Sequence, residues 1–191
     1  DDFILGLRNQ FGNFHLVPEG GANYYGVMGC MEIAKELDVQ PDFFATSAGT
    51  GTTATGLLLS ATQHQKVMVF SGLKGGEFLK DDIKHLINYT TYNSEDTDDI
   101  LQHLNLITDY HFGGFAKITP ELVEFTNAFY RQFQIPLDLI YTSKLFYGLF
   151  DMIRKNHFKP HSKIVALHTG GLQGNNGFSG QMKKMGISLI Y

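Results

Sequence analysis

Residues 42–71 read DFFATSAGTGTTATGLLLSATQHQKVMVFS and contain the clearest fold signal in the chain. Two short apolar runs, residues 42–45 and 66–71, flank a segment of helical composition at residues 53–63. Short strands that are apolar on both faces and alternate with helices are typical of βαβ units around a parallel sheet. This stretch therefore predicts one such unit.

The same alternation continues on both sides of this unit. Asn23 can cap a helix at its start, and the sequence Thr119-Pro120-Glu121 combines a cap, a proline in the first turn and an acidic residue. The polar run at residues 89–99 is expected to be a solvated loop. The pattern predicts strands at residues 14–17, 105–108 and 163–168, and helices at 24–37, 75–87, 119–134 and 143–156. We expect an α/β fold of three αβα layers with a mostly parallel sheet, in one domain spanning residues 1–191.

Composition excludes several classes of protein. The chain has 191 residues, 43% hydrophobic and 18% charged, which suffices for a hydrophobic core and argues against disorder. A net charge of -4 argues against nucleic acid as the main partner. The single cysteine, Cys30, excludes a disulfide framework. No apolar run is long enough for a membrane span and no signal peptide is visible, so we expect a soluble, cytoplasmic protein without a membrane partner.

Histidine spacing gives a weak metal signal. His157 and His161 are four residues apart, as helical zinc ligands often are, but Pro160 lies between them and breaks a helix. We expect no metal site.

Three segments join a predicted strand to glycine and hydroxyl residues: residues 46–54, 141–144 and 168–171. Ligands of open parallel sheets bind at the carboxyl ends of the strands, where such segments lie. In the first segment, two glycines let backbone N–H groups converge at a helix N-terminus and three threonines add hydroxyl groups. This composition predicts a phosphate cradle formed by Gly49, Thr50, Gly51, Thr52 and Thr53.

The residues alone leave the identity of the phosphate ligand open. The spacing Gly49-x-Gly51-x-x-Ala54 formally matches the dinucleotide fingerprint, so a nicotinamide oxidoreductase is one alternative. That fingerprint also needs an acidic residue about 20 positions later to hold the ribose. The strand at 66–70 instead continues into Ser71-Gly72-Leu73. A nucleotide P-loop is excluded because no Gly-Lys-Ser/Thr follows.

Four motifs together resemble one enzyme family. PEGGAN (18–23), SAGTGTT (47–53), YTSK (141–144) and HTGG (168–171) follow one another here in the order found in the pyridoxal-phosphate enzymes of the D-cysteine desulfhydrase and 1-aminocyclopropane-1-carboxylate deaminase family. The resemblance implies the tryptophan-synthase-β-like fold, pyridoxal 5′-phosphate as cofactor and a homodimer. It covers nearly the whole chain but only the C-terminal part of a family member.

The resemblance also implies roles for individual residues. Residues 49–53 would hold the cofactor phosphate, and Tyr141 would be the catalytic tyrosine for proton transfer or substrate activation. Thr142 and Thr169 would lie near the pyridine nitrogen. Deaminases of the family have glutamate at the position of Thr142, so this chain is more similar to the desulfhydrases. The implied reaction is deamination or β-elimination of a small amino acid, with ammonia and a 2-oxo acid as products.

The chain departs from the family pattern at two places. Phe115 stands where the family has a second active-site tyrosine, and nothing in the sequence matches the segment with the Schiff-base lysine. Without that lysine the covalent chemistry of the cofactor is incomplete. We therefore expect a fragment whose lysine lies upstream of Asp1, inactive alone. The alternative is a non-catalytic homologue that binds a phosphate ligand.

Overall fold

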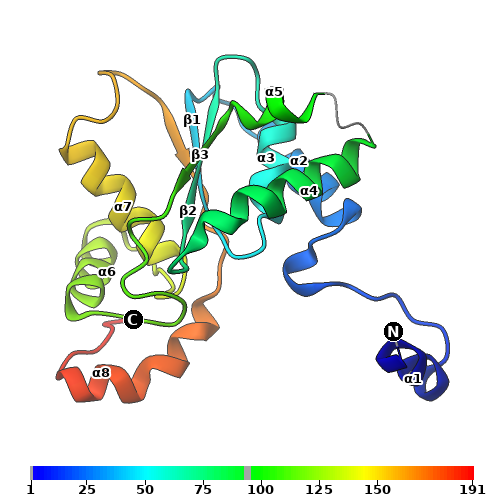
Figure 1. Cartoon of the computed structure of the whole chain (residues 1–191). Helices are drawn as coiled ribbons and strands as arrows, with labels where there is room; N and C mark the ends of the chain where they lie inside the picture. The colour runs from blue at the N-terminus through cyan, green and yellow to red at the C-terminus, as the bar shows by residue number, and fades with distance from the viewer. Residues whose placement is uncertain (1, 93–95) are drawn as a thin grey trace.

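A computed structural model describes residues 2–92 and 96–191. Its centre is a sheet of four parallel strands in the order β3-β2-β1-β4 (Figure 1). The strands are β1 (Phe43–Ala48), β2 (Lys66–Ser71), β3 (Leu104–Ile107) and β4 (Ile164–Ala166). In the register of the sheet, Phe43 of β1 pairs with Lys66 of β2 on one side and with Ile164 of β4 on the other. The predicted parallel α/β sheet is confirmed.

Helices cover both faces of this sheet, because successive side chains of β1 and β2 point to opposite sides. Phe44 and Val67 face α2 (Tyr24–Lys35), α3 (Thr52–Ser60) and α4 (Leu79–Thr91). Met68 and Phe70 face α7 (Thr142–Arg154), and α6 (Pro120–Phe133) packs on α7. The structure thus has the expected three layers, with an apolar core on each side of the sheet (Figure 1).

The predicted helix starts are accurate where a cap is present. The side chain of Asn23 accepts a hydrogen bond from the N–H of Gly26, and Thr119 accepts one from Leu122 with Pro120 as the first helical residue. In the predicted helix at residues 75–87, a short 3₁₀ turn (Gly76–Phe78) precedes α4.

The N-terminal segment differs from the prediction. Helix α1 (Asp2–Phe11) has no buried residue and lies away from the rest of the chain (Figure 1). The strand predicted at residues 14–17 is absent, and Leu16 and Val17 are 54% and 63% exposed. The prediction was wrong because apolar sequence alone does not form a strand without a neighbouring strand to pair with.

The predicted loop at residues 89–99 is also wrong where the structure describes it. Helix α4 continues to Thr91, and α5 (Thr97–Leu101) begins within the acidic run; residues 93–95 lie outside the described part. Asp98 and Asp99 occupy the first turn of α5, where negative charge stabilises a helix. Thr97 is buried, so this turn belongs to the packed structure.

The C-terminal part contains elements that the sequence did not predict. Strand β4 is three residues long and half-buried, because it is an edge strand and not the longer buried strand expected at residues 163–168. A 3₁₀ segment (Leu172–Phe178) and α8 (Ser179–Met185) follow it. Phe178 and Met182 pack against Leu122 and Val123 of α6. The division into one domain of residues 1–191 stays a prediction. No helix within the described ranges is both long and apolar enough to cross a membrane.

Candidate functional site

The turn from β1 into α3 presents unpaired backbone donors. Gly51 precedes α3 with a φ of 80° and gives its first turn no side-chain cap. The N–H groups of that turn therefore keep their capacity to bind an anion, and the helix dipole favours negative charge there. Leu57 and Leu58 bury the rest of α3 in the core, which holds this end of the helix in place.

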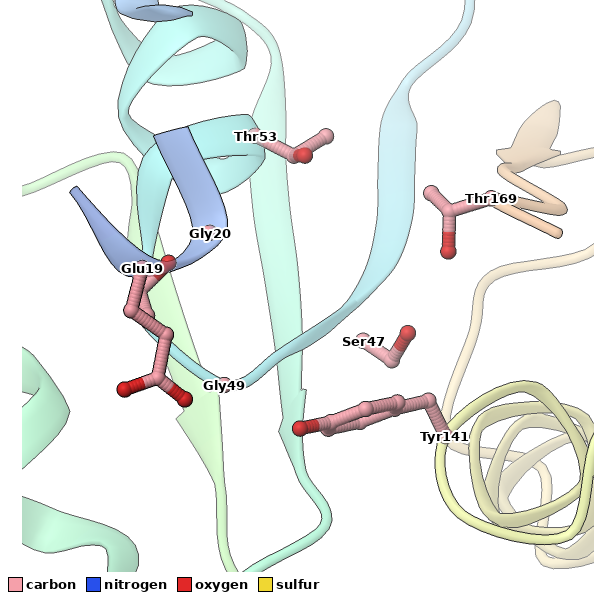
Figure 2. Close-up of a pocket in the computed structure, with 8 residues that line it drawn as sticks. Glu19, Gly20, Ser47, Gly49, Thr53, Tyr141 and Thr169 are labelled. Carbon is pink, nitrogen blue, oxygen red and sulfur yellow. The ribbon is translucent and has the colours of Figure 1, made fainter. Parts of the chain in front are cut away.

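Two adjoining cavities lie at this turn. The smaller one, of about 60 Å³, is lined by Gly20 and by residues 47–53. The larger one, of about 330 Å³, is lined by Glu19, Gly20, Ser47, Gly49, Thr50, Thr53, Tyr141 and Thr169 (Figure 2). The structure thus brings Gly49, Thr50, Gly51, Thr52 and Thr53 together and places Tyr141 and Thr169 on the same cavity. What these residues bind stays a prediction.

The cradle is built from two motifs that are distant in sequence. The hydroxyl of Thr52 donates to the carbonyl oxygen of Gly20 at 3.0 Å. A Cβ on Gly20 would overlap the side chain of Thr50, and the φ of Gly20 is 62°, so glycine suits this position. The motif at residues 18–23 therefore forms one wall of the cradle at residues 47–53.

Tyr141 lies against two glycine backbones. A Cβ on Gly49 would be 2.8 Å from its hydroxyl oxygen, and a Cβ on Gly72 would be 3.3 Å from its Cδ1. Burial raises the pKa of Tyr141, and the carboxylates of Asp138 and Glu19 raise it further. The phenol of Tyr141 therefore keeps its proton at neutral pH.

Asp138 is a residue that the sequence analysis missed. Its buried carboxylate accepts hydrogen bonds from the backbone N–H groups of Ile140, Tyr141 and Thr142 at 2.9, 2.7 and 2.9 Å. This carboxylate therefore fixes the turn that presents Tyr141. An aspartate that accepts from the N–H two residues later forms an Asx turn, and aspartate in a loop is a sequence signal for such a turn.

The two threonines assigned to the pyridine nitrogen occupy different places. Thr169 lines the larger cavity. Thr142 is fully buried and does not line either cavity, and its hydroxyl donates to a carboxylate oxygen of Asp138 at 2.6 Å. Of the pair, the structure therefore brings only Thr169 to the cavity.

Glu19 is a second residue that the sequence analysis did not assign. Its side chain extends from a short 3₁₀ turn (Glu19–Gly21) before α2 toward the hydroxyl of Tyr141 (Figure 2). It is exposed and lines the larger cavity. The cavity thus combines an acidic side chain, a phenol and a ring of hydroxyl groups.

The residue that the resemblance aligns with a second family tyrosine lies beside Tyr141. The ring of Phe115 lies 6.2 Å from the ring of Tyr141, so an aromatic residue without a hydroxyl stands beside the phenol. Among the described residues that line the two cavities, none is a lysine. The described ranges also contain no group of three or more side chains that could hold a metal ion.

Known proteins with similar sequences carry two enzyme names. No protein-family model matches the chain. A Pyrococcus horikoshii protein with the provisional name 1-aminocyclopropane-1-carboxylate deaminase is 32% identical over 88% of the chain and 52% of its own length. The mitochondrial bifunctional D-cysteine desulfhydrase/1-aminocyclopropane-1-carboxylate deaminase of Arabidopsis thaliana is 28% identical over 84% of the chain and 42% of its own length.

A solved structure with a related name has a similar fold. The crystal structure of an ACC deaminase homologue matches with a TM-score of 0.80 and 26% identity, over 96% of this chain and 57% of that one. The chain therefore spans about half the length of the relatives that it matches.

Proposed function

Since the chain is a relative of the D-cysteine desulfhydrase and 1-aminocyclopropane-1-carboxylate deaminase family, we propose that it forms the C-terminal, cofactor-binding portion of a pyridoxal-phosphate enzyme. The proposed reaction of the complete protein is deamination or β-elimination of a small amino acid, with release of ammonia and a 2-oxo acid. The observation that carries the proposal is the glycine and threonine cradle, which faces the phenol of Tyr141 across one cavity.

The residues present fit the cofactor. Its phosphate is a dianion that needs several N–H and O–H donors, and the N–H groups of the uncapped first turn of α3 offer them together with the hydroxyls of Thr50 and Thr53. The hydroxyl of Thr52 instead donates to Gly20 and holds the cradle wall. The cradle is closed by glycines whose Cβ atoms would fill it, as on Gly20. When bound, pyridoxal phosphate supplies an electron sink for the carbanion formed at the substrate.

The chain's own residues anchor the cofactor phosphate and hold a proton near the substrate. The cradle at residues 49–53 anchors the phosphate, and Thr169 offers a neutral hydroxyl on the opposite part of the cavity wall. Tyr141 holds a proton on its oxygen, because burial and the two nearby carboxylates oppose its ionisation. Phenol and hydroxyl groups therefore act as proton and hydrogen-bond donors to the substrate.

The position of Thr142 favours the desulfhydrase side of the family. Its neutral hydroxyl stands where the resemblance places a glutamate in deaminases, and here it donates to Asp138. A carboxylate at that position would meet the buried carboxylate of Asp138 and repel it. We propose β-elimination over ring opening on this ground.

The first experiment incubates the 191-residue chain, and the longest natural chain that contains it, with pyridoxal phosphate. Both are reduced with borohydride and weighed intact. We expect saturable cofactor binding by both chains and a stoichiometric adduct on one lysine in the longer chain only.

The other outcomes have distinct meanings. Reversible binding without an adduct in either chain would replace the enzyme with a non-catalytic protein that binds a phosphate ligand. Absence of saturable binding in both chains would overturn the proposal altogether.

A further inference from the structure

Lys144 is a buried lysine in the first turn of α7, three residues after Tyr141. It is 1% exposed, and its ammonium donates to the carbonyl oxygens of Gly114 at 2.8 Å and Gly72 at 3.2 Å. None of the ion pairs among the described residues includes it. A cation that is removed from water without a carboxylate in contact is costly, so its presence needs an explanation.

The two carbonyl groups belong to segments that surround Tyr141. Gly72 follows β2, and its backbone lies against the ring of Tyr141 and the carbonyl oxygen of Ile140. Gly114 lies in the loop between β3 and α6, directly before Phe115, whose ring is tilted toward that of Tyr141. The ammonium thus joins α7 to two backbone segments that flank the phenol.

The tip of the second segment has few other ties to the rest of the molecule. Its N–H groups form local hydrogen bonds, from Gly113 to the ring of His111 and from Gly114 to the carbonyl oxygen of His111. Gly113 and Gly114 have φ values of 97° and 120°, a conformation that only glycine adopts readily. Phe112 and Ala116, on either side, pack against a buried cluster around Leu122. The carbonyl oxygen of Gly114 also accepts a local bond from the N–H of Lys117. Of the hydrogen bonds described for the tip, the one from Lys144 connects it to α7.

Stability alone does not account for a lysine at this position. Methionine has a similar length, fills irregular apolar space and carries no charge to desolvate. Replacement of buried charged groups by apolar ones of similar volume is often neutral or stabilising. A hydrogen-bonded cation does, however, fix its acceptors in one arrangement, which an apolar side chain cannot do.

We propose that Lys144 is a positioning residue of the candidate active site, which holds the tip at residues 113–115 so that Phe115 stays packed against Tyr141. The name of the site rests on the proposed function, whereas the role of Lys144 concerns the geometry of this chain. Lys144 touches neither cavity and acts through the two carbonyl groups.

The chain contains no tryptophan, which makes a direct test possible. In a Phe115→Trp background the introduced indole is the only one, and its emission reports the position of the tip. We expect Lys144→Met in this background to shift the emission to longer wavelength and to increase quenching by acrylamide about two-fold. The urea midpoint of unfolding is expected to stay the same or to rise.

Lys74→Met is the matched control, because the atoms of Lys74 that a Cβ on Gly114 would meet are its own Cβ and backbone N, which this substitution keeps. We expect it to leave the emission and the quenching unchanged. If Lys144→Met changes neither signal, or if Lys74→Met changes both equally, the proposal is overturned.

A second variant covers the case in which Lys144→Met does not fold. Lys144→Gln keeps one amide donor but has a shorter reach, so increased quenching with a cooperative unfolding transition would support the proposal, and unchanged quenching would overturn it. Pyridoxal phosphate is absent from all these measurements. Failure of the proposed function therefore leaves their result valid.

Discussion

The hydroxyl of Tyr141 lies directly over the backbone of Gly49, so that a Cβ on this glycine would be 2.8 Å from the phenolic oxygen. The phenol of Tyr141 can thus occupy this place only because residue 49 of the cradle has no side chain. This contact brings the carboxyl end of β1 and the start of α7 to one cavity, although the two lie far apart in the sequence.

Gly49→Ala is expected to displace the Tyr141 ring and to weaken pyridoxal phosphate binding about ten-fold or more, because a methyl group at 2.8 Å forces the phenol out of its place. Titration of the cofactor absorbance measures the effect. Gly29→Ala is the control, since a Cβ at this exposed position in α2 would meet no atom within 4 Å. Equal affinities of both variants would remove Gly49 from the binding site.

Tyr141→Phe is expected to lower the turnover of the longest natural chain about 10²-fold or more, as the loss of a general acid does. Cofactor affinity is expected to change little, because the cradle at residues 49–53 stays intact. Steady-state kinetics with small amino acids measures this effect. Tyr25→Phe on the exposed side of α2 is the control. Turnover that is unchanged in Tyr141→Phe would exclude the phenol from the reaction.

Asp138→Ala is expected to lower the free energy of unfolding by about 2–4 kcal/mol, because it leaves one buried and two partly buried backbone N–H groups without an acceptor. Urea denaturation measures the loss. Asp98→Ala is the control: Asp98 pairs with Lys84 on the surface and lies in the first turn of α5, so we expect a loss of at most about 1 kcal/mol there. If Asp138→Ala lowers the free energy of unfolding as little as Asp98→Ala does, water replaces the carboxylate as the acceptor in the turn.

The stability of the chain is expected to rise between about pH 8 and pH 10. Burial lowers the pKa of Lys144 to about 8, against an opposing effect of Asp138. The unfolded lysine has a pKa of about 10.4, so within this window the unfolded chain binds a proton that the folded chain does not. The free energy of unfolding then increases with pH.

Above about pH 10 the direction reverses. Burial and the hydrogen bond to Asp151 raise the pKa of Tyr110 to about 12, and burial also raises that of Tyr141. The unfolded tyrosines lose their protons first, near a pKa of about 10, and stability falls. Urea midpoints from pH 7 to pH 11 measure both the rise in stability below pH 10 and the fall above it. Lys144→Met is expected to abolish the rising limb only; a rise that persists in this variant would assign it to another group.

The sequence predicted the centre of the fold because its signals there are local. The strand at residues 66–71 is apolar at successive positions, and the cap residues Asn23 and Thr119 mark helix starts within one turn of the chain. The strand predicted at residues 14–17 failed because a strand depends on a partner elsewhere in the chain. Local composition carries no information on whether that partner exists.

In the candidate site, too, the sequence predicted the local features and missed those that depend on distant residues. Glycine and threonine composition predicted the cradle, since backbone approach and helix-end donors are properties of one turn. Whether Thr142 faces the cavity depends on the packing of Asp138, and the acceptors of Lys144 are 30 and 72 residues away. Contacts over such separations leave no periodic trace in the sequence.

The topology of the sheet predicts that the parts of this site form at different times during folding. Strands β1 and β2 pair across a short crossover that contains α3, so residues 49–53 of the cradle belong to a unit with mainly local contacts. Strand β4 pairs with β1 only when a long loop closes, as the bond from Lys163 to Asp42 across 121 residues shows. Closure of long loops is entropically costly and slow. We therefore expect residues 49–53 to reach their native arrangement early during folding, and the wall that carries Thr169 to complete the cavity last.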